Sequence, residues 1–187
     1  MVKFKFKFMI IPSPQDKKEP KIHETCFIAP NATIIGNVEM DKGSNVWPGA
    51  VIRCELGSLK IGRNVSIQEN VTIHIEPGGS MIMGNNIIIG HNAMVHGPGK
   101  VGDNVLIGIS SVVLNDCIID DNVVIAAGAV VREKTHCKSG TLWAGVPAKT
   151  IREFDDPEKL GQRAKMGASY YKQNAKKFKK YFDSLSE

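Results

Sequence analysis

The sequence predicts an all-β solenoid, a parallel β-helix wound from six-residue repeats and followed by one α-helix. Three observations predict this fold. The chain of 187 residues contains 37 Val and Ile but only 7 Leu, which favours strands over a helical bundle, where Leu dominates. Aliphatic residues recur at every sixth position over most of the chain. Asn or Gly commonly stands three positions after them, where a coil must turn a corner.

The repeat comprises 17 hexads between residues 28 and 136. Its first positions are Ile28, Ile34, Met40, Val46, Ile52, Ile61, Ile67, Ile73, Met83, Ile89, Val95, Val101, Ile107, Val113, Ile119, Ile125 and Val131. The fifth positions are mostly small or branched, so both positions fit a narrow interior. One hexad cannot bury its apolar residue alone, but stacked turns bury a continuous column. With three hexads per turn, the sequence predicts between five and six turns.

The fourth position predicts the corners, because Asn and Gly tolerate the positive φ that a corner requires. Asn stands there eight times, at Asn31, Asn37, Asn64, Asn70, Asn86, Asn92, Asn104 and Asn122, and Gly at Gly43, Gly49 and Gly128. Two hexads carry Glu55 and Glu76 there and are followed by insertions of three and four residues. We expect loops that leave the coil at these two points.

The repeat divides the chain into three parts. Residues 25–150 form the β-helix, and residues 1–24 form an N-terminal strand or extension, whose Lys and Phe alternate as in a strand. Residues 151–187 form a helix that packs on the coil or on a neighbouring subunit. Its apolar face consists of Leu160, Ala164, Gly167, Tyr171, Ala175, Phe178 and Phe182. A helix lying on a membrane surface is the less favoured reading.

Charge and composition exclude several function classes. The net charge is +5, but residues 25–150 carry nine basic against ten acidic side chains, without the basic and aromatic patch of a nucleic-acid-binding surface. No apolar run reaches the roughly 18 residues of a membrane span. Four cysteines show no CxxC pair and no disulfide-dense spacing, which favours a reduced, cytoplasmic protein.

Three histidines are placed by the repeat. His74 and His96 are second in hexads that lie three steps apart, so they share a side of the coil in adjacent turns, about 4.8 Å apart. His91 is third in its hexad and lies on another side. We therefore predict a metal between subunits, bound by His74 and His96 of one chain and His91 of the next. A closed ring of such contacts in a triangular coil predicts a homotrimer.

Further polar residues flank these positions. Arg53 stands on the side of His74 one turn earlier, and Gln68 and Glu69 stand one turn before His91. Arg53 and Glu69 could pair across the same interface. Such a pair could belong to the site, or it could be an ion pair that only joins the subunits. Three neutral imidazoles would leave a fourth position open on zinc, where the pKa of a bound water falls to about 7.

The chain resembles the gamma-class carbonic anhydrase family over roughly residues 22–150. The pieces that carry the resemblance are VWPGAVIRCE (46–55), NVSIQENVTIH (64–74), IGHNAMVHG (90–97), VLIGISSVVLNDCIIDDNVVIAAGAVV (105–131) and WAGVPAK (143–149). The resemblance implies a left-handed β-helix and a homotrimer that binds zinc at its interfaces, with iron or cobalt as alternatives. It also implies reversible hydration of CO₂ to bicarbonate by a zinc-bound hydroxide.

The same resemblance implies roles for single residues. His74, His91 and His96 match the metal ligands, Gln68 matches a residue that contacts the metal-bound water, and Arg53 and Glu69 match an Arg–acid pair across the interface. The sequence departs from the family at Arg53-Cys54-Glu55, where Arg-Gly-Asp is usual, and at Ser66, where Asn is usual. It also lacks the long acidic loop with a proton-shuttle Glu, since only the short stretch Glu76–Ile82 follows His74. The proton released in the reaction would then leave through Glu76 or directly through buffer.

Other activities fit the repeat as well. A hexapeptide acyltransferase that uses acetyl-CoA needs one catalytic His and a groove for CoA. A thioesterase could use the same metal-bound hydroxide. A metal-binding scaffold protein could keep the site with weak turnover.

Overall fold

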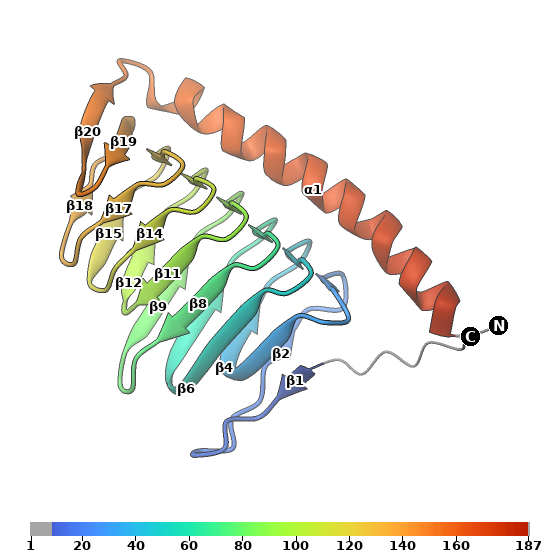
Figure 1. Cartoon of the computed structure of the whole chain (residues 1–187). Coiled ribbons are helices and arrows are strands. Elements are labelled where there is room, and N and C mark those ends of the chain that lie inside the picture. The colour runs from blue at the N-terminus through green and yellow to red at the C-terminus, as the bar shows by residue number, and fades with distance from the viewer. Residues whose placement is uncertain (1–8, 187) are drawn as a thin grey trace.

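Three sides make each turn of the coil, and successive turns stack in parallel with matched residues side by side (Figure 1). The structure is a computed structural model that describes residues 9–186. The predicted left-handed β-helix with one C-terminal helix is confirmed. The Lys and Phe alternation of residues 3–8 lies outside the described residues.

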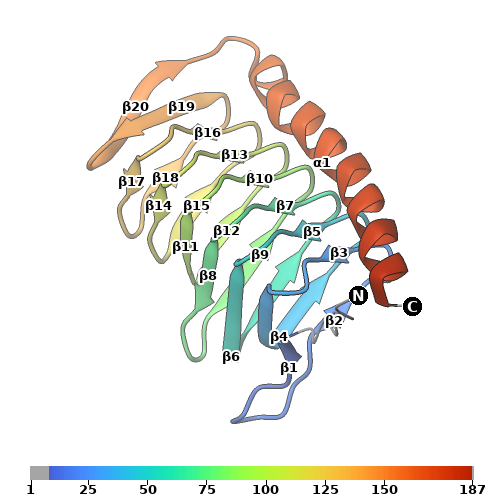
Figure 2. The ribbon, with the colours of Figure 1, turned by 45° about the vertical axis from the view of Figure 1, so that its right-hand side comes forward.

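The first side, called the helix-covered side, is a sheet that α1 (Pro157–Ser186) overlies (Figure 2). Its parallel strands are β3 (Phe27–Ile28), β5 (Asn45–Val46), β7 (Ser66–Ile67), β10 (Ile88–Ile89), β13 (Leu106–Ile107), β16 (Val124–Ile125) and β19 (Thr141–Gly145). These strands mark about seven turns, more than the predicted five to six. The prediction was short because β2 (Lys21–Ile22) lies before the first predicted hexad at Ile28, and β19 extends the stack beyond the last one.

The second side, called the histidine side, and the third side belong to one sheet, because two long strands continue from one side to the other. These strands are β4 (Thr33–Met40) and β6 (Val51–Ile61). The histidine side also contains β1 (Met9–Ile11), β8 (Thr72–Ile75), β11 (Met94–Gly97), β14 (Val112–Val113) and β17 (Val130–Val131). The third side also contains β2, β9 (Ser80–Met83), β12 (Gly99–Val101), β15 (Cys117–Ile119) and β18 (His136–Cys137).

The interior of the coil is filled by the residues that the repeat predicts. Every first-position residue from Ile34 to Val131 is in the buried core, and Ile28 in the first turn is partly buried. Most fifth positions are buried too, including Ala32, Val65 and Val105, whereas Leu56 and Pro77, in the two hexads that precede the insertions, are exposed. One turn takes 18 residues where no insertion occurs, as between Leu106 and Val124.

Most of the predicted corner Asn residues do have the positive φ that a corner requires. Asn64, Asn86, Asn104 and Asn122 have φ between 56° and 59°. Each side-chain amide donates to the next along this corner, with N···O distances of 3.1 Å, 3.1 Å and 3.2 Å. Asn31 and Asn37 are not among the residues with positive φ, and Gly36 takes a φ of 86° instead.

The predicted loops at the two insertions are only partly correct. After Glu55 the chain does not leave the coil but stays in β6, whose later residues Ser58–Ile61 pair with Ser80–Met83 of β9. After Glu76 a short turn with Gly78 at a φ of 76° leads directly into β9. The inserted residues therefore mostly lengthen strands of the third side, because both insertions lie in adjacent turns and pair with each other.

The chain ends in a hairpin and the helix. Strand β20 (Ala148–Glu153) runs antiparallel to β19, and α1 then runs back along the coil toward its N-terminal end (Figure 1). Asp156 caps the helix, since its Oδ1 accepts a hydrogen bond from the Lys159 backbone N–H at 3.1 Å. The rings of Trp47 and Phe178 pack edge to face with centroids 5.2 Å apart.

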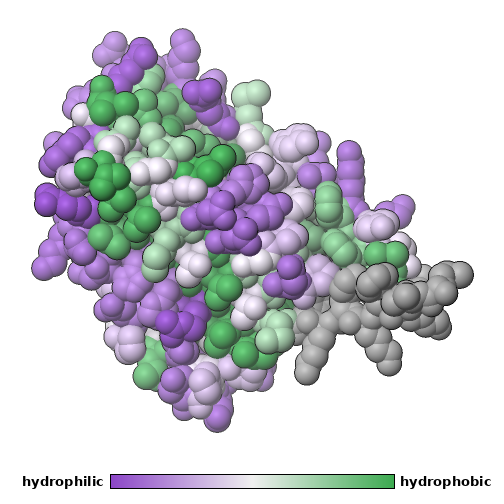
Figure 3. All heavy atoms as spheres, viewed as in Figure 1, coloured by the Kyte–Doolittle hydropathy of each residue, from purple (hydrophilic) through white to green (hydrophobic). Residues whose placement is uncertain are grey.

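Polar and apolar side chains share the molecular surface (Figure 3). In Figure 3 apolar side chains gather over the C-terminal turns, near β17, β18 and β20, a region whose exposed large apolar residues include Ile118, Val146 and Ile151. Within residues 9–186, no helix combines the length and the apolar character that crossing a membrane would require.

Candidate metal centre

The histidine side brings three of the predicted site residues into one row. Arg53 in β6, His74 in β8 and His96 in β11 are paired across adjacent strands. His74 Nδ1 lies 3.2 Å from His96 Nε2. The six-residue period causes this stacking, because side chains at equal positions in adjacent turns leave the coil in the same direction.

The separation of the two nitrogens fits a shared metal ion. Two nitrogens bound to one tetrahedral zinc at 2.0–2.1 Å lie roughly 3.3 Å apart. The other ring nitrogen of His74, Nε2, is buried and has no hydrogen-bond partner among the residues that the structure describes. Burial, followed by the nearby charges of Arg53 and His96, lowers the pKa of His74 and favours the neutral imidazole, the form that binds metals.

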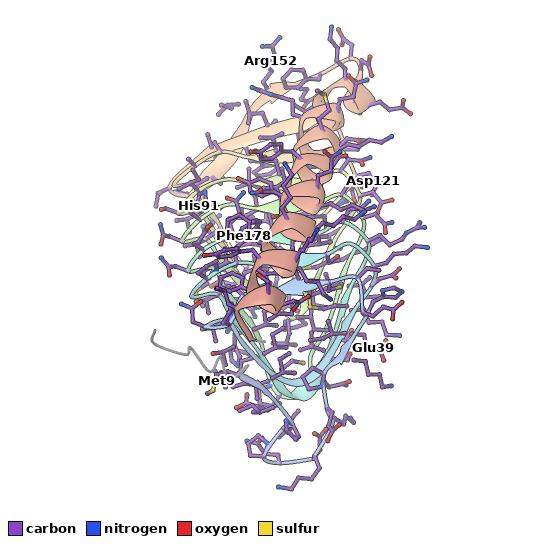
Figure 4. All side chains as sticks on the ribbon, turned by 90° about the vertical axis from the view of Figure 1, so that its right-hand side faces the viewer. Met9, Glu39, His91, Asp121, Arg152 and Phe178 are labelled. Carbon is purple, nitrogen blue, oxygen red and sulfur yellow. The ribbon has the colours of Figure 1, made fainter. Side chains whose placement is uncertain are left out.

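His91 lies away from this pair, just after β10 on the helix-covered side. Its Nδ1 is 2.7 Å from Glu69 Oε2, and its backbone N–H donates to Gln68 Oε1 at 3.1 Å. Gln68 is only 4% exposed, so its amide is held rigidly beside the His91 backbone. Figure 4 shows His91 at one edge of α1, with Asp121 at the other.

Arg53 and Glu69 have partners within the chain. Arg53 Nη1 lies 2.6 Å from Glu55 Oε2, and Glu69 pairs with His91. The partnership with Glu55 is one that the sequence reasoning missed. Residues two apart in a strand point to the same face, so this pair could have been read from the sequence.

Glu76 follows β8 and stands close to the histidine pair. Its Oε1 is 3.7 Å from His96 Nε2, and about half of its side chain is exposed. A carboxylate that touches a site residue and also reaches solvent has the position that a proton carrier needs.

A cavity of about 380 Å³ opens beside His91. It lies between α1 and the helix-covered side, and its lining includes Gln68, Ile109, Ala127 and Tyr171. The lining is mostly apolar, and the sequence reasoning missed it because it depends on where α1 lies.

One chain assembles only part of a metal site. Among residues 9–186, no three side chains of His, Cys, Asp or Glu are grouped closely enough to hold a metal ion. The structure brings together His74 and His96, with Arg53 and Glu76 beside them. It brings together His91, Glu69 and Gln68 in a second group.

The chain is similar in sequence to a hexapeptide-repeat family and to gamma carbonic anhydrases. The family described as bacterial transferase hexapeptide (six repeats) matches residues 19–54 and 98–133. Gamma carbonic anhydrase 2, mitochondrial, of Arabidopsis thaliana is 31% identical over 75% of this chain and 52% of that protein. Protein YrdA of Escherichia coli is 33% identical over 77% of this chain and 82% of that protein.

The fold has relatives among solved structures. The crystal structure of a hexapeptide transferase family protein from Anaplasma phagocytophilum matches with a TM-score of 0.83 and 29% identity, over 91% of this chain and 98% of that one. The chain spans only about half the length of the Arabidopsis relatives, between 52% and 57%.

Proposed function

Because the chain belongs to the gamma carbonic anhydrase family of hexapeptide-repeat, left-handed β-helix proteins, we propose that it catalyses the reversible hydration of CO₂ to bicarbonate. The proposed site lies between subunits of a homotrimer. His74 and His96 of one chain and His91 of the next would hold the metal. The observation that carries the proposal is the 3.2 Å separation of the His74 and His96 nitrogens.

A zinc ion held by three neutral imidazoles supplies, when bound, a hydroxide nucleophile at neutral pH. Iron or cobalt would suit the same imidazole set. His91 can offer Nε2 because Glu69 accepts a hydrogen bond from Nδ1–H, which fixes the ring and its tautomer. The metal identity and the trimer are parts of the proposal.

The remaining residues have separate tasks. The Gln68 amide, whose oxygen accepts from the His91 backbone N–H, would orient the nucleophile through its NH₂ group. Arg53, held by Glu55, would place a positive charge next to His74, where bicarbonate forms. Glu76 would pass the released proton from the site to solvent, because it reaches both.

A second activity is favoured by one observation. The apolar cavity beside His91 has a volume of about 380 Å³, far more than CO₂ needs. An acyl chain carried by CoA would fit such a lining, and the matched families include transferases by name. His91 would then act as a single base, without metal.

A CO₂ hydration assay on zinc-loaded protein separates these activities. We expect turnover in the parent chain, loss in His91→Ala, and no change in His136→Ala, whose imidazole pairs with Asp120 away from the site. Turnover of acetyl-CoA in the metal-free protein, with no CO₂ hydration in the loaded protein, would contradict the anhydrase and support the transferase.

The compartment is also a proposal. Four buried thiols without a disulfide fit the reduced, cytoplasmic location that the sequence predicts. The names of the Arabidopsis relatives place those proteins in mitochondria.

A further inference from the structure

We propose that the chain has a second binding site, for an oxyanion of the phosphate class, at a corner of the coil beneath α1. A pocket of about 200 Å³ lies there, and its lining residues are Lys42, Arg63, Asn64, Asn85, Asn86 and Lys172. The histidines take no part in it, so the inference does not depend on the proposed function.

The charge of this pocket is positive and unbalanced. Lys42, Arg63 and Lys172 line it together, and no carboxylate of the described part of the chain does. None of the three forms an ion pair with any residue in the range 9–186. Three cations around one depression repel each other, and a bound anion would relieve that repulsion.

The side chains of two of these cations cannot accept the hydrogen bond that later turns use at this corner. Asn85, Asp103 and Asp121 occupy the same corner position in later turns, and each side-chain Oδ1 accepts a hydrogen bond from the backbone N–H one turn earlier. The N···O distances are 2.9 Å, 2.7 Å and 2.7 Å. Lys42 and Arg63 hold this position in the earlier turns, and their side chains contain no acceptor.

The helix contributes the third cation in a fixed place. A methyl group on Gly43 would lie 3.0 Å from Lys172 Cε, so the Lys172 side chain crosses the corner in close packing. The preceding residue, Tyr171, packs against Trp47 with ring centroids 5.9 Å apart. This anchoring reduces the entropy that Lys172 would lose on binding a ligand.

The hydrogen-bond donors that line the pocket indicate which class of ligand would bind there. The amides of Asn64 and Asn86 already donate along the corner, so the cationic groups are the main free donors. A guanidinium fork and two ammonium groups together match an ion with several charged oxygens, such as phosphate or a phosphate monoester. The Arg63 Nε faces Asn85 Oδ1 at 3.4 Å, which directs the guanidinium along the pocket wall.

The pocket and His91 lie at opposite edges of α1 (Figure 4). Asp121 belongs to the same stacked corner position, and Figure 4 shows α1 between Asp121 and His91. The interface proposed around His91 therefore leaves the pocket open. Metal binding and oxyanion binding can be measured separately.

Isothermal titration calorimetry on the metal-free chain of 187 residues tests the site, with sodium chloride holding the ionic strength constant. The probes are inorganic phosphate, glycerol 3-phosphate and bicarbonate. We expect saturable phosphate binding with one site per chain. Arg63→Gln and Lys172→Gln should each weaken it about tenfold, since each removes a charge-assisted hydrogen bond. Lys177→Gln, which removes an exposed charge of the same helix, should leave the Kd unchanged.

Other outcomes decide against the site. Absence of saturable phosphate binding to the parent chain would overturn it, and so would an equal loss in Lys177→Gln, because general charge would then explain the binding. Bicarbonate binding as tightly as phosphate would overturn the assignment to the phosphate class. Tighter binding of glycerol 3-phosphate than of phosphate would support an organic phosphate as the ligand. Circular dichroism confirms that each variant is folded.

Discussion

Glu69 Oε2 lies 2.7 Å from His91 Nδ1, one turn of the coil away along the chain. The sequence suggested a different partner for Glu69, namely Arg53 across an interface. Within the chain, Glu69 instead fixes the imidazole of a proposed metal ligand. A carboxylate that accepts from one ring nitrogen makes the other a better ligand.

We therefore expect Glu69→Ala to weaken zinc binding about 10- to 100-fold, and Glu69→Gln to weaken it less because the amide oxygen still accepts. Competition with a chromophoric chelator measures the affinity. Glu39→Gln is the control, since Glu39 pairs with Lys21 and Lys60 on the third side, away from the histidines. If Glu69→Ala binds zinc as tightly as the parent while His91→Ala does not, Glu69 has no supporting role.

Mixed trimers test whether the metal site is shared between subunits. His91→Ala and His74→Ala chains should each bind no zinc alone. In a refolded equimolar mixture, each mixed trimer would contain one intact interface, so about a quarter of the parent metal content should return. Metal analysis after gel filtration measures it. No recovery in well-formed mixed trimers would show that the three histidines do not meet across an interface.

The period of the repeat explains how much of the site the sequence could predict. A fixed number of residues per turn determines which side chains stack, so the row of Arg53, His74 and His96 followed from counting. The buried first and fifth positions followed in the same way. Whether His91 joins the pair depends on a second chain, and this remains a prediction.

Other features depend on contacts that counting does not describe. Ser58–Lys60 stay in β6 rather than in a loop because β9 offers them strand partners. Gly36 takes the positive φ at its corner in place of Asn37. A Cβ on Gly36 would lie against the carbonyl oxygen of Cys54, so no other residue fits there. The pocket and the apolar cavity depend on how α1 lies on the coil.

The stacked corner residues Asn64, Asn86, Asn104 and Asn122 stabilise the fold through their backbone conformation and through their side-chain hydrogen bonds. Substitutions at Asn104 measure the two contributions separately. Asn104 has a φ of 57° and hydrogen bonds to Asn86 and Asn122. Asn104→Gly keeps the corner but removes these bonds, which should lower the free energy of unfolding by about 1–2 kcal/mol. Asn104→Ala removes the same bonds but keeps a β-carbon in the left-handed region, without the local hydrogen bonding by which Asn tolerates it, at a further cost of about 1 kcal/mol. Urea unfolding measures both, and equal stability of the two variants would contradict the role of φ.

The four cysteines should be inert in the native protein. All are buried, and burial raises the pKa of Cys26 and Cys54 to about 11, so almost no thiolate exists at pH 8. Ellman's reagent should label four thiols in denaturant and fewer than one in native buffer within the same time. Rapid native labelling of one thiol that is lost in Cys54→Ala would show that Cys54 is reactive, despite its burial.

The same thiols predict how stability depends on pH. Burial raises the pKa of Cys137 from an ordinary value of 9.0 to about 12. Between these values the unfolded chain loses the thiol proton while the folded chain keeps it, so the unfolded state binds fewer protons. The free energy of unfolding should therefore be unaffected by this thiol below pH 9 and should fall as the pH rises from 9 toward 12. Urea titrations at pH 8, 9 and 10 measure the slope. Cys137→Ala should make it shallower, because one of the thiols that ionise only on unfolding is gone, whereas an unchanged slope would mean that Cys137 ionises equally in both states.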